Sequence, residues 1–403
     1  MKNIDFSTKK KSLSYTELRN CPLCNSSQSK SILRFDNFQF LTDSHENPKT
    51  VDIDIHICDQ CTTLFNNPVY TDEGFKNLFA EMGQSYGMSE GRSNEQIDYL
   101  SNIGVLNKVN SILDLGCYRG ELLSHFPNEL EKDGIDIDSP SIEIAKKQFP
   151  NINFFCQDLE KFNTGKKYDL ITMLHVLEHL KNPLEVLKNI LNSAHSKTCL
   201  LVEVPIIENG FTNDVNGFFS AQHLTHFSRR SLQNFFKKAG WDIQRVDEQK
   251  TYNGARVIAS PSIEKSEFIP SIGNDPSTLY SYFQHWFNVL QTIEEKLDQF
   301  CKSDQYIIWG AGLHTEFLFN KTFFFQRKKN AKFLFFDSDP LKIGKTYRGV
   351  PIVSPFNEAT IIPVGTPIIL SSYAGTETMR KECIKRGWKT DHIISFYDHF
   401  HLY

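Results

Sequence analysis

Residues 111–120 read Ser-Ile-Leu-Asp-Leu-Gly-Cys-Tyr-Arg-Gly, and this stretch decides the fold of the central part of the chain. A short apolar run predicts a buried strand, and the glycines after it predict a tight turn into a helix. Glycine at such a turn lets the backbone approach a ligand closely, and the helix N-terminus favours a carboxylate or phosphate group. We therefore expect a nucleotide-type site that includes Asp114, Gly116 and Gly120.

The pattern of short apolar runs continues along the chain. Further runs stand at residues 132–138, 152–158, 168–174 and 198–205, separated by helical stretches. This alternation predicts a parallel sheet with crossover helices.

Two acids follow the next two predicted strands. Asp136 closes the second strand, at the place where a carboxylate accepts hydrogen bonds from ribose hydroxyls. Asp158 follows the third strand, where a carboxylate can accept a hydrogen bond from the exocyclic amine of adenine. Their neighbours Ile137 and Leu159 are predicted to line the same site.

Four segments together resemble a known family. Residues 113–120 (LDLGCYRG), 134–138 (GIDID), 154–162 (FFCQDLEKF) and 168–180 (YDLITMLHVLEHL) resemble, in this order, the motifs of class I S-adenosylmethionine-dependent methyltransferases. The resemblance covers about residues 95–260, and residues 223–241 look like the family's final helix. It implies S-adenosylmethionine as cofactor and S-adenosylhomocysteine as product. Tyr118 departs from the pattern, because these enzymes usually carry a second glycine there. A dinucleotide-binding dehydrogenase is the alternative for one glycine-rich turn, and four ordered motifs favour the methyltransferase.

Two Cys-x-x-Cys pairs stand near the N-terminus, Cys21 with Cys24 and Cys58 with Cys61. Four thiolates are enough for a closed tetrahedral zinc site, and such a site has no open position for catalysis. We expect a structural zinc module. Four reduced, unliganded cysteines are the alternative, and the many acids between the pairs disfavour a nucleic-acid finger.

At 403 residues the chain is long for one core, so several domains are expected. We predict a zinc module over residues 1–75, a methyltransferase domain with leading helices over 76–260, and a linker with a helix over 261–303. Residues 304–403 restart the strand–helix alternation. The predicted fold class is therefore α/β, a Rossmann-like methyltransferase core with an N-terminal four-cysteine zinc module and a smaller C-terminal Rossmann-like domain.

This domain order resembles the zinc-containing sugar C-methyltransferases of deoxysugar biosynthesis. Those enzymes methylate the carbon beside a ketone in a nucleotide-linked keto-sugar, so the resemblance implies a nucleotide-sugar as the small-molecule partner. Their proposed base lies in a Tyr-His-Glu-His run. Residues 220–228 (SAQHLTHFS) keep only its final histidine, as His223, while His226 stands where a tyrosine would be. A base near neutral pKa suits removal of a proton from carbon. Packed or capping histidines are the alternative.

Three more residues are candidates by the same resemblance. His175 and Glu178 border the methyl donor in this class, and Tyr86 resembles an aromatic residue that closes over the sulfonium. The run His-x-x-Glu-His also occurs in zinc peptidases, inside a long helix. Here it follows a predicted strand directly and ends at Asn182-Pro183, which disfavours that reading.

In the C-terminal domain, Gly310, Gly312 and His314 follow a predicted strand, and Asp337 ends the next one. The resemblance suggests that these residues bind the nucleotide or sugar of the acceptor. A degenerate domain that only packs against the core, or a second enzyme, are the alternatives.

The composition of the chain limits the kinds of binding partner that we expect. The net charge of −4 gives no footprint for nucleic acid or an anionic membrane. Neither a long apolar run nor a signal-peptide core is present, so we expect a cytoplasmic monomer or homodimer. O- or N-methylation, and a cofactor-binding scaffold without catalysis, stay open as alternative functions.

Overall fold

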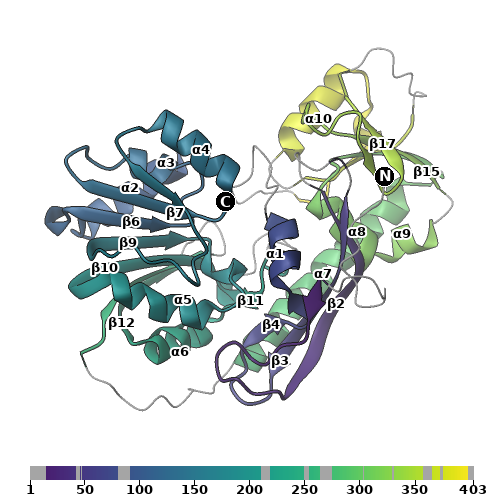
Figure 1. The fold of residues 1–403 in the computed structure, drawn as a ribbon. Coiled ribbons are helices and arrows are strands. Elements are labelled where there is room, and N and C mark those ends of the chain that lie inside the picture. The colour runs from purple at the N-terminus through teal and green to yellow at the C-terminus, as the bar shows by residue number, and fades with distance from the viewer. Residues whose placement is uncertain are drawn as a thin grey trace.

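The computed structural model describes residues 15–41, 46, 48–79, 91–209, 218–248, 254–263, 275–302, 304–328, 331–356, 365–372 and 375–397. Its strands form four sheets, of two, seven, four and six strands. The seven-stranded and the six-stranded sheets lie on opposite sides of the molecule, as Figure 1 shows. No described helix is long and apolar enough to cross a membrane.

The seven-stranded sheet has the order β12-β13-β10-β9-β6-β7-β8. The bounds are β6 Ser111–Leu115, β7 Glu131–Asp136, β8 Asn153–Cys156, β9 Tyr168–Leu174, β10 Ala194–Pro205, β12 Trp241–Glu248 and β13 Gly254–Pro261. Strands β6 to β10 are parallel, and β13 is antiparallel to both of its neighbours. The strand order reverses between β6 and β9. Ligands of open α/β sheets bind at such a reversal, beyond the carboxyl ends of the strands.

Helices cover both faces of this sheet. They are α2 (Arg92–Asn102), α3 (Glu121–Ser124), α4 (Ser139–Gln148), α5 (Pro183–Ile190) and α6 (Arg229–Ala239), with short 3-10 turns η1 (Leu106–Lys108), η2 (Leu177–His179), η3 (Leu191–Ser193) and η4 (Ile207–Asn209). Successive strand residues point to opposite faces. Ile112 therefore packs with α2 to α4, whereas Leu113 packs with α5 and α6.

The boundaries of two helices follow from local sequence. The Asp138 side chain accepts a hydrogen bond from Ser141 N and caps α4, which has a proline in its first turn. In α6, Ser228 and Ser231 form a reciprocal capping box, and the helix ends at Gly240 with φ 89°.

The N-terminal part contains β1 (Thr16–Glu17), β2 (Ser29–Phe40), β3 (Lys49–Cys58), β4 (Leu64–Asn66), β5 (Val69–Tyr70) and α1 (Asp72–Phe79). Strands β1 and β5 form a separate pair. The four-stranded sheet has the order β11-β4-β3-β2 and is antiparallel. Its edge strand β11 (Thr225–His226) comes from far along the chain, just before α6. The N-terminal sheet and the central domain therefore share a strand.

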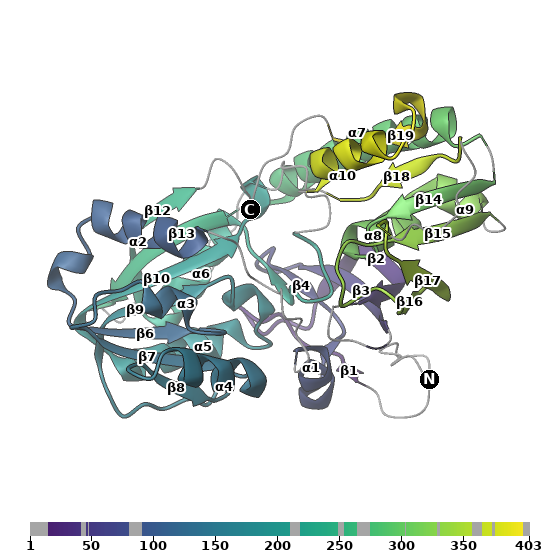
Figure 2. The same ribbon diagram turned by 90° about the horizontal axis from the view of Figure 1, so that it is seen from above.

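The C-terminal sheet has the order β16-β17-β15-β14-β18-β19 (Figure 2). Its elements are β14 (Gln305–Trp309), β15 (Lys332–Phe336), β16 (Thr346–Tyr347), β17 (Val350–Val353), β18 (Ile368–Leu370) and β19 (Ile393–Ile394), with α7 (Asp275–Phe300), α8 (Leu313–Lys321), α9 (Phe323–Arg327), α10 (Thr376–Lys385) and η5 (Thr390–His392). All its pairings are parallel except that of β16 with β17.

One apolar core joins the N-terminal sheet, α7 and the C-terminal sheet. At its centre Phe219 lies with its ring against His226, Tyr282 and Trp286, at centroid distances of 4.7, 5.5 and 6.1 Å. Aromatic pairs at such distances add to the stability gained from burial. The predicted fold class is confirmed: a Rossmann-like α/β core, a four-cysteine cluster and a second, smaller C-terminal sheet.

Candidate functional site

The carboxyl ends of the parallel strands carry the first group of predicted site residues. Asp114, on β6, is 4% exposed and accepts a hydrogen bond of 2.6 Å from Thr172 Oγ1 on the adjacent β9. Burial raises the pKa of Asp114 to about 7, although the Thr172 bond opposes this shift. The carboxyl group is therefore held at the strand reversal in an environment of low polarity.

The turn after β6 depends on glycine. Gly116 has φ 80°, and a Cβ atom there would lie 2.3 Å from Val176 Cγ2. Gly120 has φ 76°, and its Cβ would lie 2.3 Å from Phe154 Cζ. Both positions thus require glycine for conformation and for space.

Asp136, at the end of β7, fixes the same turn. Its Oδ2 accepts a hydrogen bond from Tyr118 N at 2.8 Å, and its Oδ1 accepts one from Asp138 N at 2.9 Å. Burial raises the pKa of this carboxyl group, and the backbone hydrogen bonds oppose the shift. Each carboxylate oxygen has two lone pairs, so both can still accept from a ligand. Tyr118, which replaces the usual glycine, has φ 48° and joins the turn through its backbone.

Strand β8 brings the third acid to the same edge. Asp136 is paired in register with Cys156, so the loop after β8 starts beside the end of β7. Asp158 in that loop is exposed, and its Oδ1 accepts a hydrogen bond from Glu160 N at 2.9 Å. Ile137 is 44% exposed at this edge, whereas Leu159 is buried in the core.

A charged cluster at the ends of β9 and β10 was not predicted from the sequence. Glu203 is fully buried, and its Oε1 lies 2.8 Å from His175 Nε2 and 3.2 Å from Arg92 Nη2. Its Oε2 accepts from Arg256 Nε at 2.5 Å. Burial alone would raise the pKa of Glu203, but His175 and the two guanidinium groups hold it below its ordinary value. Because these residues lie far apart in sequence, their spacing carries no signal.

His175 has an unusual backbone. It has φ 54°, and its N–H donates to Glu203 O at 2.8 Å. Its Nε2 faces Glu203 and its Nδ1 lies 3.4 Å from Glu178 Oε1. The two carboxylates raise the pKa of His175, although burial and Arg92 oppose this. Non-glycine residues in this conformation are uncommon and cluster at functional sites.

A second group lies beyond His175. Ligand atoms of Glu178, His179 and His223 lie within 4.8 Å of one another. The His179 and His223 rings meet edge to face at a centroid distance of 4.9 Å. The backbone fixes this arrangement, because Leu224 N donates to Glu178 O at 2.7 Å. Burial and the neighbouring His179 lower the pKa of His223 to about 4, so its ring is neutral at pH 7.

His226 lies deeper than His223. It is 2% exposed, its Nδ1 lies 3.2 Å from Phe218 O, and its Nε2 lies 2.8 Å from Asn66 Oδ1. Burial lowers the pKa of His226 to about 3. Both ring nitrogens are engaged within the core, so this geometry favours His223 over His226 for contact with a ligand. Tyr86 lies outside the described residues.

Comparisons with known proteins bear on the same region. Residues 88–246 match the family model described as "Methyltransferase domain". The chain therefore contains a class I S-adenosylmethionine-dependent methyltransferase domain.

Individual curated relatives match shorter stretches of the chain. A protein of Invertebrate iridescent virus 6 that bears a methyltransferase name is 28% identical over 139 residues, which cover 32% of this chain and 52% of that protein. The ubiquinone biosynthesis O-methyltransferase of Coxiella burnetii is 36% identical over 92 residues, 20% of this chain and 38% of that enzyme. The chain thus spans about half the length of these curated relatives, or less.

Solved structures align with part of the chain. An S-adenosylmethionine-dependent methyltransferase from Clostridium acetobutylicum aligns with 47% of this chain and 98% of its own, at 11% identity and a TM-score of 0.37.

The four cysteines converge beside the methyltransferase domain. Their sulfur atoms lie within 4.8 Å of one another, with Cys21–Cys61 and Cys24–Cys58 at 3.5 Å. Sulfur atoms on a tetrahedral zinc with bonds of about 2.3 Å are about 3.8 Å apart, so the cluster fits this ion. The predicted convergence is confirmed.

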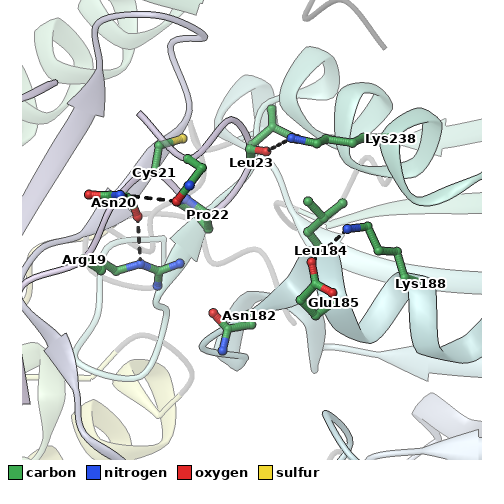
Figure 3. A pocket seen from close by; sticks show the side chains of 11 residues that line it. Arg19, Asn20, Cys21, Pro22, Leu23, Asn182, Leu184, Glu185, Lys188 and Lys238 are labelled. Atoms are coloured by element: carbon green, nitrogen blue, oxygen red, sulfur yellow. Dashed lines mark hydrogen bonds and ion pairs between the residues drawn. The ribbon is translucent and has the colours of Figure 1, made fainter. Parts of the chain in front are cut away.

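A cavity of about 380 Å³ lies where the first cysteine pair meets the methyltransferase domain (Figure 3). Arg19, Leu23, Asn182 and Lys238 are among its lining residues, and Lys238 Nζ donates to Leu23 O at 2.6 Å. None of the strand-end acids or histidines described above lines this cavity. It marks the joint between the two parts.

The C-terminal sheet repeats the arrangement found at Asp136. Asp337, after β15, accepts from Ala311 N at 3.0 Å and from Asp339 N at 2.9 Å. Gly310 has φ 119°, and a Cβ there would lie 2.3 Å from Ser371 O. Gly312 has an extended backbone and faces open space.

His314 lies behind this C-terminal turn. It is 5% exposed, with Nδ1 2.8 Å from Ser371 Oγ and Nε2 2.7 Å from Tyr397 Oη. Burial lowers the pKa of His314 to about 3. The other three predicted acceptor residues lie at the turn, whereas His314 packs within the core.

The buried His314 makes stability depend on pH. Between pH 7 and 5 the unfolded chain takes up a proton at this histidine, whose ordinary pKa is about 6.5, and the folded chain does not. The free energy of unfolding should therefore fall by about 2 kcal/mol through His314 alone. Denaturant titrations of the chain and of His314→Gln at pH 7 and pH 5 measure this term. His314→Gln should lose about 2 kcal/mol less, and His125→Gln, at an exposed site, should behave like the parent. Equal losses in all three proteins would contradict it.

Proposed function

We propose that this chain transfers a methyl group from S-adenosylmethionine to a small molecule. One observation carries the proposal: a methyltransferase domain whose glycines and acids gather at the carboxyl ends of β6, β7 and β8. Asp136 would accept hydrogen bonds from the ribose hydroxyls, and Asp158 would accept a hydrogen bond from the adenine amine. The turn from Gly116 to Gly120 would lie against the amino-acid part of the cofactor, with Asp114 behind it. Ile137, Leu159 and His175 would complete the lining.

We propose that the acceptor binds on the side of the transferred methyl group opposite the cofactor sulfur. When bound, the cofactor supplies an electrophilic methyl group, so the protein must position a nucleophile and, for a carbon acid, remove a proton. His223 is the proposed base, although burial lowers its pKa to about 4, below the near-neutral value expected from the sequence. Its Nδ1 faces Phe218 O at 2.9 Å, and a backbone carbonyl only accepts, so Nδ1 carries the hydrogen and Nε2 the lone pair. His179 and Glu178 stand beside it where the sugar methyltransferases have other companions.

The finer proposal is C-methylation of a nucleotide-linked keto-sugar. It rests on the resemblance of the domain order and on the turn at Gly310, Gly312 and Asp337, which we propose as the acceptor's binding site. The rival is O- or N-methylation, and the name of the Coxiella burnetii relative favours O-methylation. Mass spectrometry and NMR of a product made with a deuterated methyl donor separate them. A methyl group on oxygen or nitrogen excludes the carbanion route.

Calorimetry tests whether the chain binds the proposed cofactor. S-adenosylmethionine and S-adenosylhomocysteine should both bind, and a panel of nucleotide-sugars should contain a methyl acceptor. Binding without turnover on a broad panel would favour a scaffold. No binding of either compound would contradict the proposal itself.

We further propose that the four-cysteine cluster holds a structural zinc ion. A closed set of four thiolates supplies folding energy and has no open position for a substrate.

Substitution of Asp136 tests the cofactor site. Asp136→Ala removes a charged acceptor, so the affinity for S-adenosylmethionine should fall by about 1.5–3 kcal/mol, or roughly 10- to 150-fold in Kd. Asp242→Ala, at an exposed position on β12, should leave the Kd unchanged in the same calorimetric titration. An unchanged Kd in Asp136→Ala would place the ribose elsewhere.

Substitution of His223 tests acceptor activation. His223→Gln keeps the size of the side chain but removes its base, so kcat should fall roughly 10²- to 10⁴-fold while the KM for the cofactor stays the same. His195→Gln is the control, because His195 lies at the start of β10, at the opposite end of the strand. A fully active His223→Gln enzyme would remove His223 from the mechanism.

Substitution of a cysteine tests the zinc. With cobalt in place of zinc, the parent should show thiolate-to-cobalt absorption, which Cys24→Ser should lose together with the fold of the N-terminal module. Cys156→Ser, at an exposed cysteine outside the cluster, should keep both. Thiolate-to-cobalt absorption that survives in Cys24→Ser would argue against the site.

A further inference from the structure

Glu178 is a buried carboxylate whose surroundings are incomplete. It lies in η2, is 1% exposed, and neither of its carboxylate oxygens has a hydrogen-bond partner among the residues that the structure describes. The nearest nitrogens are His175 Nδ1 at 3.4 Å and His179 Nε2 at 3.9 Å. A buried ionised group without hydrogen bonds costs several kcal/mol unless a charge or ligand compensates it.

His175 Nδ1 lies at ion-pair distance from Glu178, but the same ring is bound to Glu203 through Nε2. His179 and His223 cannot compensate the Glu178 charge in their neutral forms. His179 Nδ1 faces Gln222 O and His223 Nδ1 faces Phe218 O, both at 2.9 Å. Backbone carbonyls only accept, so each Nδ1 carries the ring hydrogen and each Nε2 carries a lone pair. One ring nitrogen of each histidine and a carboxylate oxygen of Glu178 lie within 4.8 Å of one another, and His179 Nε2 lies 3.9 Å from Glu178 Oε1.

This arrangement is typical of metal-ligating histidines. Such residues usually donate the other ring N–H to a carbonyl or carboxylate, which fixes the ring and its tautomer. Imidazole and carboxylate ligands suit zinc and neighbouring divalent transition metals. Two histidines and one glutamate leave a fourth position open, as in catalytic zinc sites.

We propose that Glu178, His179 and His223 bind a divalent transition-metal cation of the zinc class. The site is separate from the four cysteines and has an open position. Ligand atoms on a tetrahedral zinc are about 3.3 Å apart, so small side-chain rotations must bring the three groups closer. The His179 side chain keeps 16% of its surface exposed, which gives the cation access.

The role of this cation rests on the proposed function. Glu178 lies three residues beyond His175 at the end of β9, next to the proposed methyl donor. A cation here would polarise an oxygen of the acceptor and lower the pKa of the adjacent C–H or O–H group. With the cation bound, His223 acts as a ligand in place of its proposed role as base, and the proton that the acceptor releases passes to solvent water.

Zinc stoichiometry of the full chain, measured by elemental analysis after dialysis, tests the site. The parent should hold a second zinc ion beyond the one at the cysteines. His179→Ala and Glu178→Gln should each lose that second ion and keep the first, with unchanged far-ultraviolet circular dichroism. Cys24→Ser should lose the first ion, and it can also lose the second because the N-terminal sheet supports His223, so the second ion is assigned by His179→Ala and Glu178→Gln. His125→Ala, at an exposed histidine, should lose neither ion.

Cobalt substitution identifies which ion is which. The cysteine site should give thiolate-to-cobalt absorption, whereas the Glu178 site should give visible bands without it, and His179→Ala should remove those bands alone. A parent protein that binds a single ion, which Cys24→Ser loses, would overturn the proposal. The charge of Glu178 would then be compensated by a proton that it shares with a neighbouring histidine. A Glu178→Gln chain that retains both ions would also overturn the proposal. Neither cofactor nor acceptor is present in these metal measurements. A protein without the second ion would therefore contradict the metal site and leave the proposed methyl transfer untouched.

Discussion

The short segment from residue 218 to 228 must satisfy three neighbours at once, and the histidine cluster depends on this constraint. Its strand β11 pairs with β4 of the N-terminal sheet, and Leu224 N donates a hydrogen bond to Glu178 O in η2, which follows β9. Its aromatic end, Phe219, is packed among side chains of α7. Because these contacts are distant in sequence, the N-terminal sheet and α7 act as supports for His223. The cysteine cluster lies at the end of that sheet, so it contributes indirectly to the position of His223.

A second constraint recurs in both α/β sheets. Asp136 and Asp337 each end the second strand of their sheet and each accept two backbone N–H groups, one from the turn after the first strand. Carboxylates that accept backbone N–H groups make strong, charge-assisted hydrogen bonds. In the first sheet this bond helps to hold Tyr118 at φ 48°, a conformation that disfavours side chains. The hydrogen bond from Tyr118 N to Asp136 thus offsets part of the cost of holding a side chain in this conformation.

Local patterns in the sequence predict the parts of this structure that local forces determine. The short apolar run that includes Ile112 and Leu113 predicts a buried strand, and the glycines at 116 and 120 predict the turn. The cysteine spacing predicts a convergence that the structure confirms. The pairing of β11 with β4, and the contact of Arg256 with Glu203, join residues that no periodicity or motif relates. The same holds for the approach of His223 to Glu178, so the companions of this histidine could be found only in three dimensions.

The two buried glutamates beside His175 show how a structural carboxylate differs from one with capacity for a ligand. Glu203 is surrounded by Arg92, Arg256 and a hydrogen-bonded His175, so its charge is compensated and its oxygens are occupied. Glu178 receives the same His175 only at 3.4 Å, without a hydrogen bond, and otherwise faces imidazole nitrogens that carry lone pairs. Burial is nearly equal for the two, so the difference lies in the partners alone. A fold that compensates one of these charges fully and leaves its neighbour incomplete concentrates its capacity to bind a cation at the second.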